Sequence, residues 1–166
     1  MHVLVGGWPG AGKTTLARAL AAELAVPLLA KDDIKEALAD VLGPPADVEA
    51  SRRLGRAAVR AMLTVARQCP NAVLDSTWFD DARPFVDALP RPLVEVRCIV
   101  DEQVARRRYL ARAGQRSRVH LDLERDDDEL WGRPVRPLGV GPLVDVDTSG
   151  PVDVPAVALR IRKVAE

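Results

Sequence analysis

Residues 7–15 read GWPGAGKTT and directly follow the short apolar run HVLVG at residues 2–6. The stretch satisfies the pattern G-x-x-x-x-G-K-[ST] through Gly7, Gly12, Lys13 and Thr14. Leucines then recur at helical spacing, at positions 16, 20 and 24. Because a strand precedes the pattern and an amphipathic helix follows it, we expect a phosphate-binding loop between the two.

The residue types in this loop suit phosphate chemistry. Glycines let backbone N–H groups turn inward around phosphate oxygens, and the following helix points its positive end at the same anion. Lys13 is expected to reach the β- and γ-phosphates, and Thr14 to bind Mg²⁺. A plain strand-to-helix turn would need neither the lysine nor two threonines. The sequence predicts ATP or GTP as ligand, contacted by Gly7, Gly10, Ala11, Gly12, Lys13, Thr14 and Thr15.

Four more short runs rich in Val and Leu have the composition of buried parallel strands: residues 27–30, 71–75, 93–100 and 143–147. Helical patterns separate them, so strand and helix alternate along the chain. We expect an α/β fold of the P-loop NTPase type, with a five-stranded parallel sheet flanked by helices. A chain of 166 residues, 48% of them hydrophobic, is expected to form one domain spanning 1–166.

Composition narrows the class of partner. Lys plus Arg (24) equal Asp plus Glu (24), which disfavours a broad polyanion-binding surface and makes nucleic acid the less favoured partner. No apolar run approaches about 20 residues and no signal-peptide pattern is present, so we expect a soluble cytoplasmic protein without a membrane partner. Cys69 and Cys98 are predicted to be free core residues rather than a disulfide or metal ligands. No pattern indicates an oligomeric state.

Asp75 stands at the end of the third strand-like run, in AVLDSTWFD at residues 72–80. A phosphate-binding loop needs an acidic partner for its metal, so Asp75 is predicted to bind Mg²⁺ together with Thr14. An aspartate after a strand also often caps a turn or a helix, and a cap is the alternative.

The stretch KDDIK at residues 31–35 follows the second strand-like run and begins a helical pattern. A helix cap would explain one of its two aspartates. Because the second strand should end at the same sheet edge as the phosphate-binding loop, one carboxylate there could instead accept a proton from an incoming hydroxyl. Capping and catalysis can coexist in this pair.

Six arginines accumulate after the fourth strand-like run, namely Arg106, Arg107, Arg108, Arg112, Arg116 and Arg118. Arg108 and Arg112 are four apart, so they share a helical face and could close on the transferring phosphoryl group together. A solvated basic helix is the alternative. We expect a mobile lid over about residues 108–130, in which the roles of the other four arginines stay open.

With these residues in place, the chain resembles, over nearly its whole length, the small AAA-type P-loop kinase-like proteins. This group surrounds the kinase domain of bacteriophage polynucleotide kinase, chloramphenicol phosphotransferase, gluconate kinase and the zeta-toxin kinases. The resemblance implies that Asp32 is the general base, that Lys35 helps to bind the acceptor and that Asp33 is the cap. It also matches Arg108, Arg112 and Gly114 to the lid arginines, and VDTS at residues 146–149 to a turn near the nucleotide base.

Two residues depart from the pattern of this group. Lys35 stands where the group has an arginine, which weakens bidentate capture of an acceptor phosphate. Trp78 stands about where the polynucleotide kinase has an asparagine, which suggests a more apolar acceptor pocket. We expect an ATP-dependent phosphotransferase acting on a hydroxyl of a small molecule such as a nucleoside, sugar or antibiotic. The alternatives are a polynucleotide 5′-hydroxyl kinase and a nucleotide-operated regulatory module.

Overall fold

The computed structural model describes residues 1–132 and 134–166. Five strands form one sheet: β1 (His2–Gly6), β2 (Leu28–Ala30), β3 (Ala72–Asp75), β4 (Leu93–Ile99) and β5 (Leu143–Asp147). The main helices are α1 (Lys13–Leu24), α2 (Lys31–Leu42), α3 (Val48–Ala66), α4 (Arg83–Val86), α5 (Glu102–Ala113), α6 (Asp127–Trp131) and α7 (Val154–Ala165). Every predicted strand is present, with ends within a residue of the expected ones.

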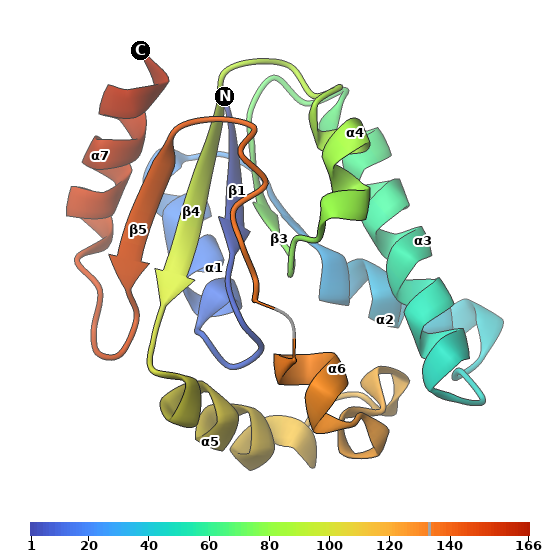
Figure 1. The fold of residues 1–166 in the computed structure, drawn as a ribbon. Coiled ribbons are helices and arrows are strands. Elements are labelled where there is room, and N and C mark those ends of the chain that lie inside the picture. Colours follow the sequence, from blue (N-terminus) through green and yellow to red (C-terminus); the bar gives the residue numbers. More distant parts are fainter. Residues whose placement is uncertain (133) are drawn as a thin grey trace.

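The strands pair in the order β2-β3-β1-β4-β5, and all four pairings are parallel. The expected α/β sheet is therefore confirmed. All carboxyl ends lie at one edge, and in Figure 1 the strands point toward the layer formed by α5 and α6. Ligands of such sheets bind at this edge, where loops and helix N-termini converge.

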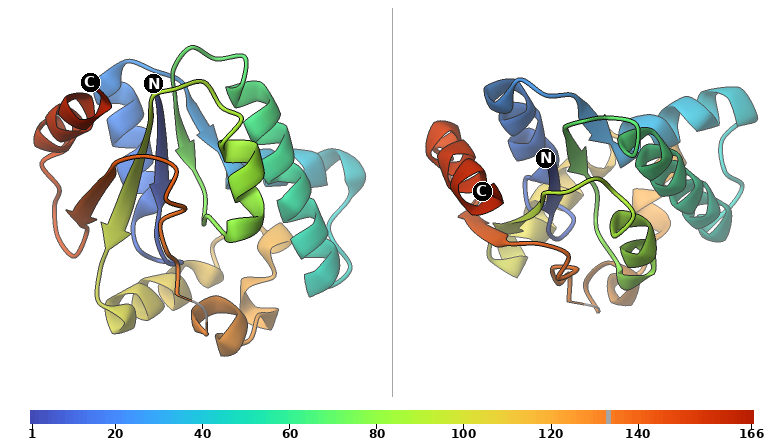
Figure 2. Two further views of the ribbon diagram at one scale, coloured as in Figure 1. Left: turned by 45° about the horizontal axis from the view of Figure 1, so that its top comes forward. Right: turned by 90° about the horizontal axis from the view of Figure 1, so that it is seen from above.

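Alternate side chains of the strands build two separate cores. The valines of β1, β3, β4 and β5 pack with α1 and α7 on one face. The other face, carrying Leu4, Leu74 and Leu93, packs with α3, α4 and Trp78. Figure 2 shows the helices on both sides of the sheet. This layering is what right-handed crossovers between parallel strands produce.

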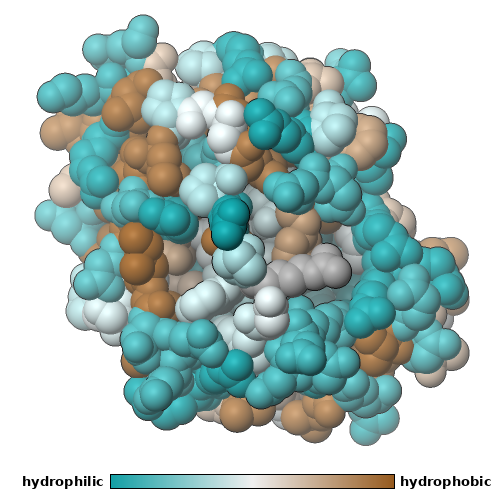
Figure 3. Space-filling view, viewed as in Figure 1, coloured by the Kyte–Doolittle hydropathy of each residue, from teal (hydrophilic) through white to brown (hydrophobic). Residues whose placement is uncertain are grey.

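The segment after α5 folds as three short pieces that cover the strand ends. Two 3₁₀ turns, Arg118–His120 and Asp122–Glu124, precede α6. Figure 3 shows mostly hydrophilic residues over α5 and α6, whereas apolar residues gather over β5. Arg125 and Glu129 form an ion pair within the segment, and Arg52 of α3 contacts Glu129 at 3.0 Å. The segment expected to act as a lid is thus linked to α3 by an ion pair, and we keep the name lid for it.

A strap at residues 134–142 runs back across the sheet before β5 begins. Its anchor is Glu95, buried in β4, whose carboxylate oxygens accept hydrogen bonds from Leu138 N (2.6 Å) and Val140 N (2.8 Å). These two backbone donors satisfy the hydrogen-bonding needs of the buried carboxylate, and they hold the strap against β4. Within residues 1–132 and 134–166, no helix has the length and apolar character needed to cross a bilayer.

The expectation that an aspartate of KDDIK caps α2 is wrong. The helix begins at Lys31 with Ala30 as its N-cap, so neither Asp32 nor Asp33 caps it through a side-chain hydrogen bond. The chain passes straight from β2 into the helix, and both carboxylates fall in its first turn, where they face the positive end of the helix. The C-terminal end of α2 also projects from the core, since Val41 is 85% exposed.

Both cysteines are free, as expected. Cys98 is buried in the core between the sheet and α1, and burial raises the pKa of its thiol to about 12. A protonated, buried thiol of this kind is a packing residue.

Candidate functional site

The loop between β1 and α1 has the backbone that the glycine pattern predicts. Gly7, Gly10 and Gly12 adopt φ angles of +143°, +77° and +82°. These values strain residues that carry a Cβ. A Cβ on Gly10 would also lie 2.1 Å from the carbonyl oxygen of Ala105 in α5. The glycines therefore allow both the turn and the close approach of α5 to the loop.

Lys13 lies at the start of α1 with its ammonium turned into the loop. Its Nζ donates to the carbonyl oxygen of Trp8 at 2.7 Å. Burial lowers the pKa of Lys13 to about 8, and the negative charge of Asp75 opposes this shift. Among the described residues, the hydrogen-bond partner of this ammonium is a neutral carbonyl, so phosphate oxygens of an incoming anion would add favourable negative charge beside it.

Asp75 lies next to this lysine at the end of β3. Burial raises the pKa of its carboxyl, while a hydrogen bond from the Thr14 hydroxyl and the charge of Lys13 work in the other direction. The described residues contain no group of three or more His, Cys, Asp or Glu arranged to hold a metal. One carboxylate and one hydroxyl nevertheless suit Mg²⁺, which completes its shell with water and phosphate oxygens.

The sheet register brings Asp32 to the same edge. Asp75 pairs with Val5 of β1 on one side and with Ala30 of β2 on the other. Gly7 lies two residues beyond Val5, and Asp32 lies two residues beyond Ala30. Parallel pairing therefore places the loop, Asp75 and Asp32 side by side, although they are far apart in the sequence.

Asp32 is surrounded by cations. Its Oδ1 accepts from Lys31 Nζ at 2.8 Å, and its Oδ2 accepts from Arg116 at 2.6 Å. His120 Nδ1 lies 3.9 Å from Oδ1. Burial alone would raise the pKa of Asp32, but Lys31, His120 and Arg116 outweigh it and hold this pKa far below its usual value. The carboxylate is therefore ionised throughout the physiological pH range.

Lys35 is buried between α2 and α3 in this structure. The side chain is 1% exposed, and Nζ donates to Ser51 Oγ of α3 at 2.6 Å. Ser51 Oγ in turn donates to the carbonyl oxygen of Val119 at 2.7 Å. Burial, helped by the charges of Lys31 and Arg125, lowers the pKa of Lys35 to about 8. In this structure Lys35 therefore contacts α3 through Ser51, which in turn contacts the lid, and its contact with an acceptor stays a prediction.

The two expected lid arginines have separate surroundings. Arg108 donates to the carbonyl oxygens of Thr148 (2.9 Å) and Ser149 (2.7 Å), in the turn after β5. Arg112 lies over the ring of Tyr109, and its buried Nε lacks a hydrogen-bond partner among the described residues. Burial and the charge of Arg116 lower the pKa of Arg112. The pair therefore does not converge on one point here.

Thr148 connects the turn after β5 to the phosphate-binding loop. The family resemblance matches residues 146–149 to a turn near the nucleotide base but gives Thr148 no separate role. Its buried hydroxyl bonds to the carbonyl oxygens of Ala11 (2.8 Å) and Ile99 (3.0 Å). Trp8 of the loop packs edge-to-face on Trp131 of α6, with ring centroids 6.2 Å apart. The loop therefore contacts both the turn after β5 and the lid.

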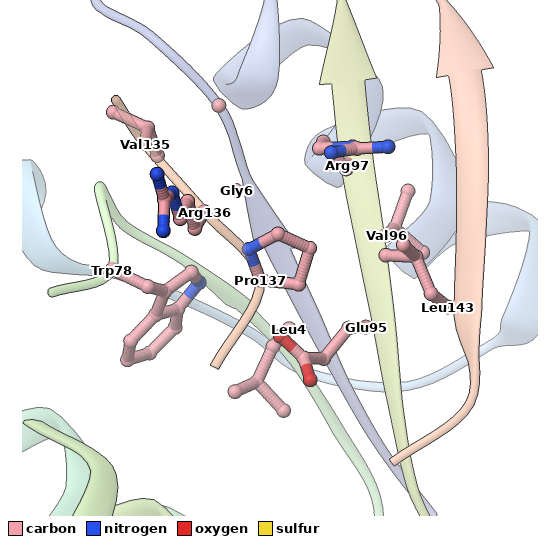
Figure 4. Close-up of a pocket in the computed structure, with 11 residues that line it drawn as sticks. Leu4, Gly6, Trp78, Glu95, Val96, Arg97, Val135, Arg136, Pro137 and Leu143 are labelled. Carbon is pink, nitrogen blue, oxygen red and sulfur yellow. The ribbon is translucent and has the colours of Figure 1, made fainter. Parts of the chain in front are cut away.

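Trp78 is buried beneath the loop rather than open to an acceptor. Its Nε1 donates to the carbonyl oxygen of Val5 at 3.0 Å, and its ring packs on Gly6. One edge of the ring lines a shallow pocket between the sheet and the strap, where Arg136 and Arg97 stand on either side (Figure 4). Neither Asp32 nor Lys13 lines this pocket, so it is distinct from the space around Asp32.

The site contains residues that sequence reasoning did not assign. Arg116 belonged to the arginine cluster without a role, and His120, Asp122 and Ser51 carried no motif. His120 Nε2 lies 2.7 Å from Glu36 Oε1. Burial lowers the pKa of His120, and Asp32 and Glu36 oppose that shift. Only the fold of the lid brings these residues to α2.

Comparison with known sequences gives a family. A family profile described as an AAA domain matches residues 2–129. Uncharacterized proteins of Mycobacterium tuberculosis and Mycobacterium bovis are 33% identical over 129 residues, which make up 69% of this chain and 26% of each relative. The chain therefore spans about a quarter of the length of these curated relatives.

Solved structures agree with this assignment. A provisionally named kinase of Chloroflexus aurantiacus aligns with a TM-score of 0.83 and 31% identity, over 99% of this chain and 98% of that one. A gluconokinase of Sinorhizobium meliloti aligns with a TM-score of 0.65 and 20% identity, over 99% and 93% of the two chains. The shikimate kinase of Acinetobacter baumannii, in complex with shikimate, gives 0.61 and 18%, over 98% and 90%.

At these lower identities, the gluconokinase and the shikimate kinase show the fold alone. The five-stranded parallel sheet flanked by helices agrees with it. This chain belongs to the AAA domain family, as one of its small P-loop kinase-like proteins.

Proposed function

We propose that this protein is an ATP-dependent phosphotransferase that moves the γ-phosphate to a hydroxyl of a small molecule. The position of Asp32 carries this proposal. The carboxylate lies at the same sheet edge as the phosphate-binding loop and Asp75, and stays ionised among cations. A module that only binds or slowly hydrolyses nucleotide has no need of a carboxylate there.

The residues proposed to bind the phosphates, the metal and the acceptor follow one another along the carboxyl edge of the sheet. The loop amides and Lys13 would bind the β- and γ-phosphates, and Thr14 and Asp75 would hold Mg²⁺. When bound, Mg²⁺ neutralises phosphate charge. Arg112, whose Nε lacks a partner among the described residues, is the lid arginine placed to bind the transferring group. Arg108 is better placed to flank the nucleotide near the turn after β5.

Asp32 then orients the acceptor hydroxyl and receives its proton. The lowered pKa makes it a weak base, which suits a loose transition state in which the hydroxyl proton leaves late. The catalytic contribution is therefore mainly alignment of the hydroxyl, with proton transfer completing the step.

A small acceptor fits the charge of the molecule. The net charge is zero, and three of the clustered arginines, Arg106, Arg108 and Arg116, are already engaged by carboxylates or backbone carbonyls. A polynucleotide would gain affinity from several phosphate contacts along a free basic track. The gluconokinase and the shikimate kinase, which share the fold, carry the names of small hydroxylated acids.

The test is ATP consumption against a panel of nucleosides, sugars, aminoglycosides, phenicols and a 5′-hydroxyl oligonucleotide at two salt concentrations. Asp32→Asn should slow acceptor-dependent turnover by about 10²-fold or more and leave ATP binding nearly intact. Asp33→Asn is the matched control, because Asp33 is exposed and lies only 3.8 Å from Arg18 on α1. Equal losses from the two substitutions would refute the role of Asp32. Salt-sensitive labelling of the oligonucleotide would favour a polynucleotide kinase instead.

A further inference from the structure

Both oxygens of the Asp32 carboxylate are already occupied in this structure. Lys31, the neighbouring residue, donates to Oδ1, and Arg116 of the lid donates to Oδ2 at 2.6 Å. An acceptor hydroxyl that gives its proton to Asp32 must first hydrogen-bond to one of these oxygens. Each carboxylate oxygen can accept a second hydrogen bond, so the hydroxyl need not displace Lys31 or Arg116 completely, but it must compete with them for Asp32.

Arg116 has a second hydrogen-bond partner in the lid, so its side chain can stay anchored there when its bond to Asp32 breaks. Its other terminal nitrogen, Nη1, donates to Asp122 at 2.8 Å. The Asp122 carboxylate is buried, with 5% of its side chain exposed, and also accepts from the hydroxyl of Tyr109 at 2.9 Å. Asp32 is more exposed, at 38%. The anchored half of the guanidinium thus faces the lid interior, and the half that can be displaced faces the acceptor side.

We propose that Arg116 is a positioning residue that guards Asp32: it occupies the carboxylate while no acceptor is bound and yields Oδ2 to the acceptor hydroxyl. This inference rests on the proposed function. Its consequence is that ATP bound alone meets a carboxylate whose ability to accept a proton from water is reduced by Arg116. The same contact holds Asp32 in the orientation that the acceptor later uses.

The two competing reactions have the same bond changes. In transfer, the acceptor oxygen forms a bond to the γ-phosphorus, the bond from that phosphorus to the bridging oxygen of ADP breaks, and the hydroxyl proton goes to Asp32. In hydrolysis, water replaces the acceptor, gives its proton to the same carboxylate and yields inorganic phosphate. The hydrogen bond from Arg116 to Asp32 therefore suppresses ATP hydrolysis until an acceptor hydroxyl competes for Oδ2.

Several other charged groups surround Asp32 and stay in place when Arg116 is changed. They are Lys13, Lys31, Lys35, Asp75, Arg112 and His120. The effect of removing Arg116 is therefore partial, and Asp32 remains ionised near neutral pH. With one cation fewer, the carboxylate becomes a stronger base and loses its proton at a higher pH than before.

The experiment measures phosphate release from ATP and Mg²⁺ without any acceptor, as a function of pH. Arg116→Gln should raise acceptor-free hydrolysis by at least about 10-fold. The acid limb of its pH profile should shift to higher pH. Arg107→Gln, the same charge change at an exposed position of α5, should leave hydrolysis unchanged. Adding Asp32→Asn to Arg116→Gln should remove the gain, which shows that the gain passes through Asp32.

Arg116→Lys covers the case in which the glutamine variant does not fold. The lysine keeps the charge, but a single ammonium is poorly shaped to bridge two carboxylates, so a smaller rise in hydrolysis is expected. The proposal is overturned if neither Arg116 variant hydrolyses ATP faster than wild type, including the case of no detectable hydrolysis in any of them. Failure of the proposed function is a separate result: a wild-type protein whose ATP consumption responds to no acceptor in the panel.

Discussion

Replacement of Lys35 by methionine tests how much the buried charge of this lysine changes the free energy of unfolding. The ammonium is 1% exposed, and its one hydrogen bond is to the neutral hydroxyl of Ser51. Methionine has a similar length and shape without the charge. Ser51 keeps its bond to the carbonyl oxygen of Val119, so no hydroxyl is orphaned by the change.

The size of the effect follows from the pKa of Lys35, which burial lowers from 10.5 to about 8. A shift of one pKa unit corresponds to about 1.4 kcal/mol, so the charged form is disfavoured in the folded state by about 3 kcal/mol. Between pH 8 and pH 10.5 the unfolded chain binds this proton while the folded chain does not. Stability therefore rises with pH across this window, by about 2 to 3 kcal/mol at pH 10.

Urea denaturation followed by circular dichroism at pH 7, 8, 9 and 10 measures this difference directly. The free energy of unfolding of wild type, minus that of Lys35→Met, should increase by about 2 to 3 kcal/mol from pH 7 to pH 10. Subtraction removes the contributions of other groups that titrate in both proteins. Lys163→Met on α7 controls for loss of an exposed positive charge. A difference that stays constant with pH would refute a charged, buried Lys35.

Other changes test the remaining parts of the site and fold. Lys13→Ala should abolish nucleotide-dependent turnover and the stabilisation of the fold by ATP, because the loop loses its ammonium; unchanged turnover would refute the phosphate-binding role. Arg108→Ala should mainly raise the KM for ATP, whereas Arg112→Ala should mainly lower kcat by about 10²-fold or more, and steady-state kinetics separate the two. Glu95→Gln should destabilise the protein by about 1–3 kcal/mol in denaturant melts, since an amide cannot accept both strap bonds. Hydrogen exchange over 108–130 should slow when a nonhydrolysable ATP analogue and an acceptor are both bound, and equal exchange would argue against a closing lid.

The sheet was predictable because each strand is a short apolar run between helical patterns. The alternation of strands and helices predicted parallel pairing. The pattern G-x-x-x-x-G-K-[ST] predicted the phosphate-binding loop. The positions of Asp75 and Asp32 beside that loop needed only the rule that strand ends share one edge, and the register confirms it.

The surroundings of Asp32 were not predictable in the same way. The contact from Arg116 to Asp32 joins residues 84 apart, and the contact from Ser51 to Val119 joins residues 68 apart. Both depend on how two 3₁₀ turns fold after α5, and short irregular turns leave no periodic signal in the sequence.

The lid arginines contact different parts of the site. Arg108 and Arg112 lie four apart in α5, about 6 Å along its axis, whereas Arg116 lies three residues beyond Ala113, where this helix ends. The three side chains therefore start from different positions. The contacts divide accordingly: Arg108 at the turn after β5, Arg116 on Asp32, and Arg112 between them with an unsatisfied Nε. For the proposed transfer, this division gives Arg108 to the nucleotide, Arg112 to the transferring phosphoryl group and Arg116 to Asp32.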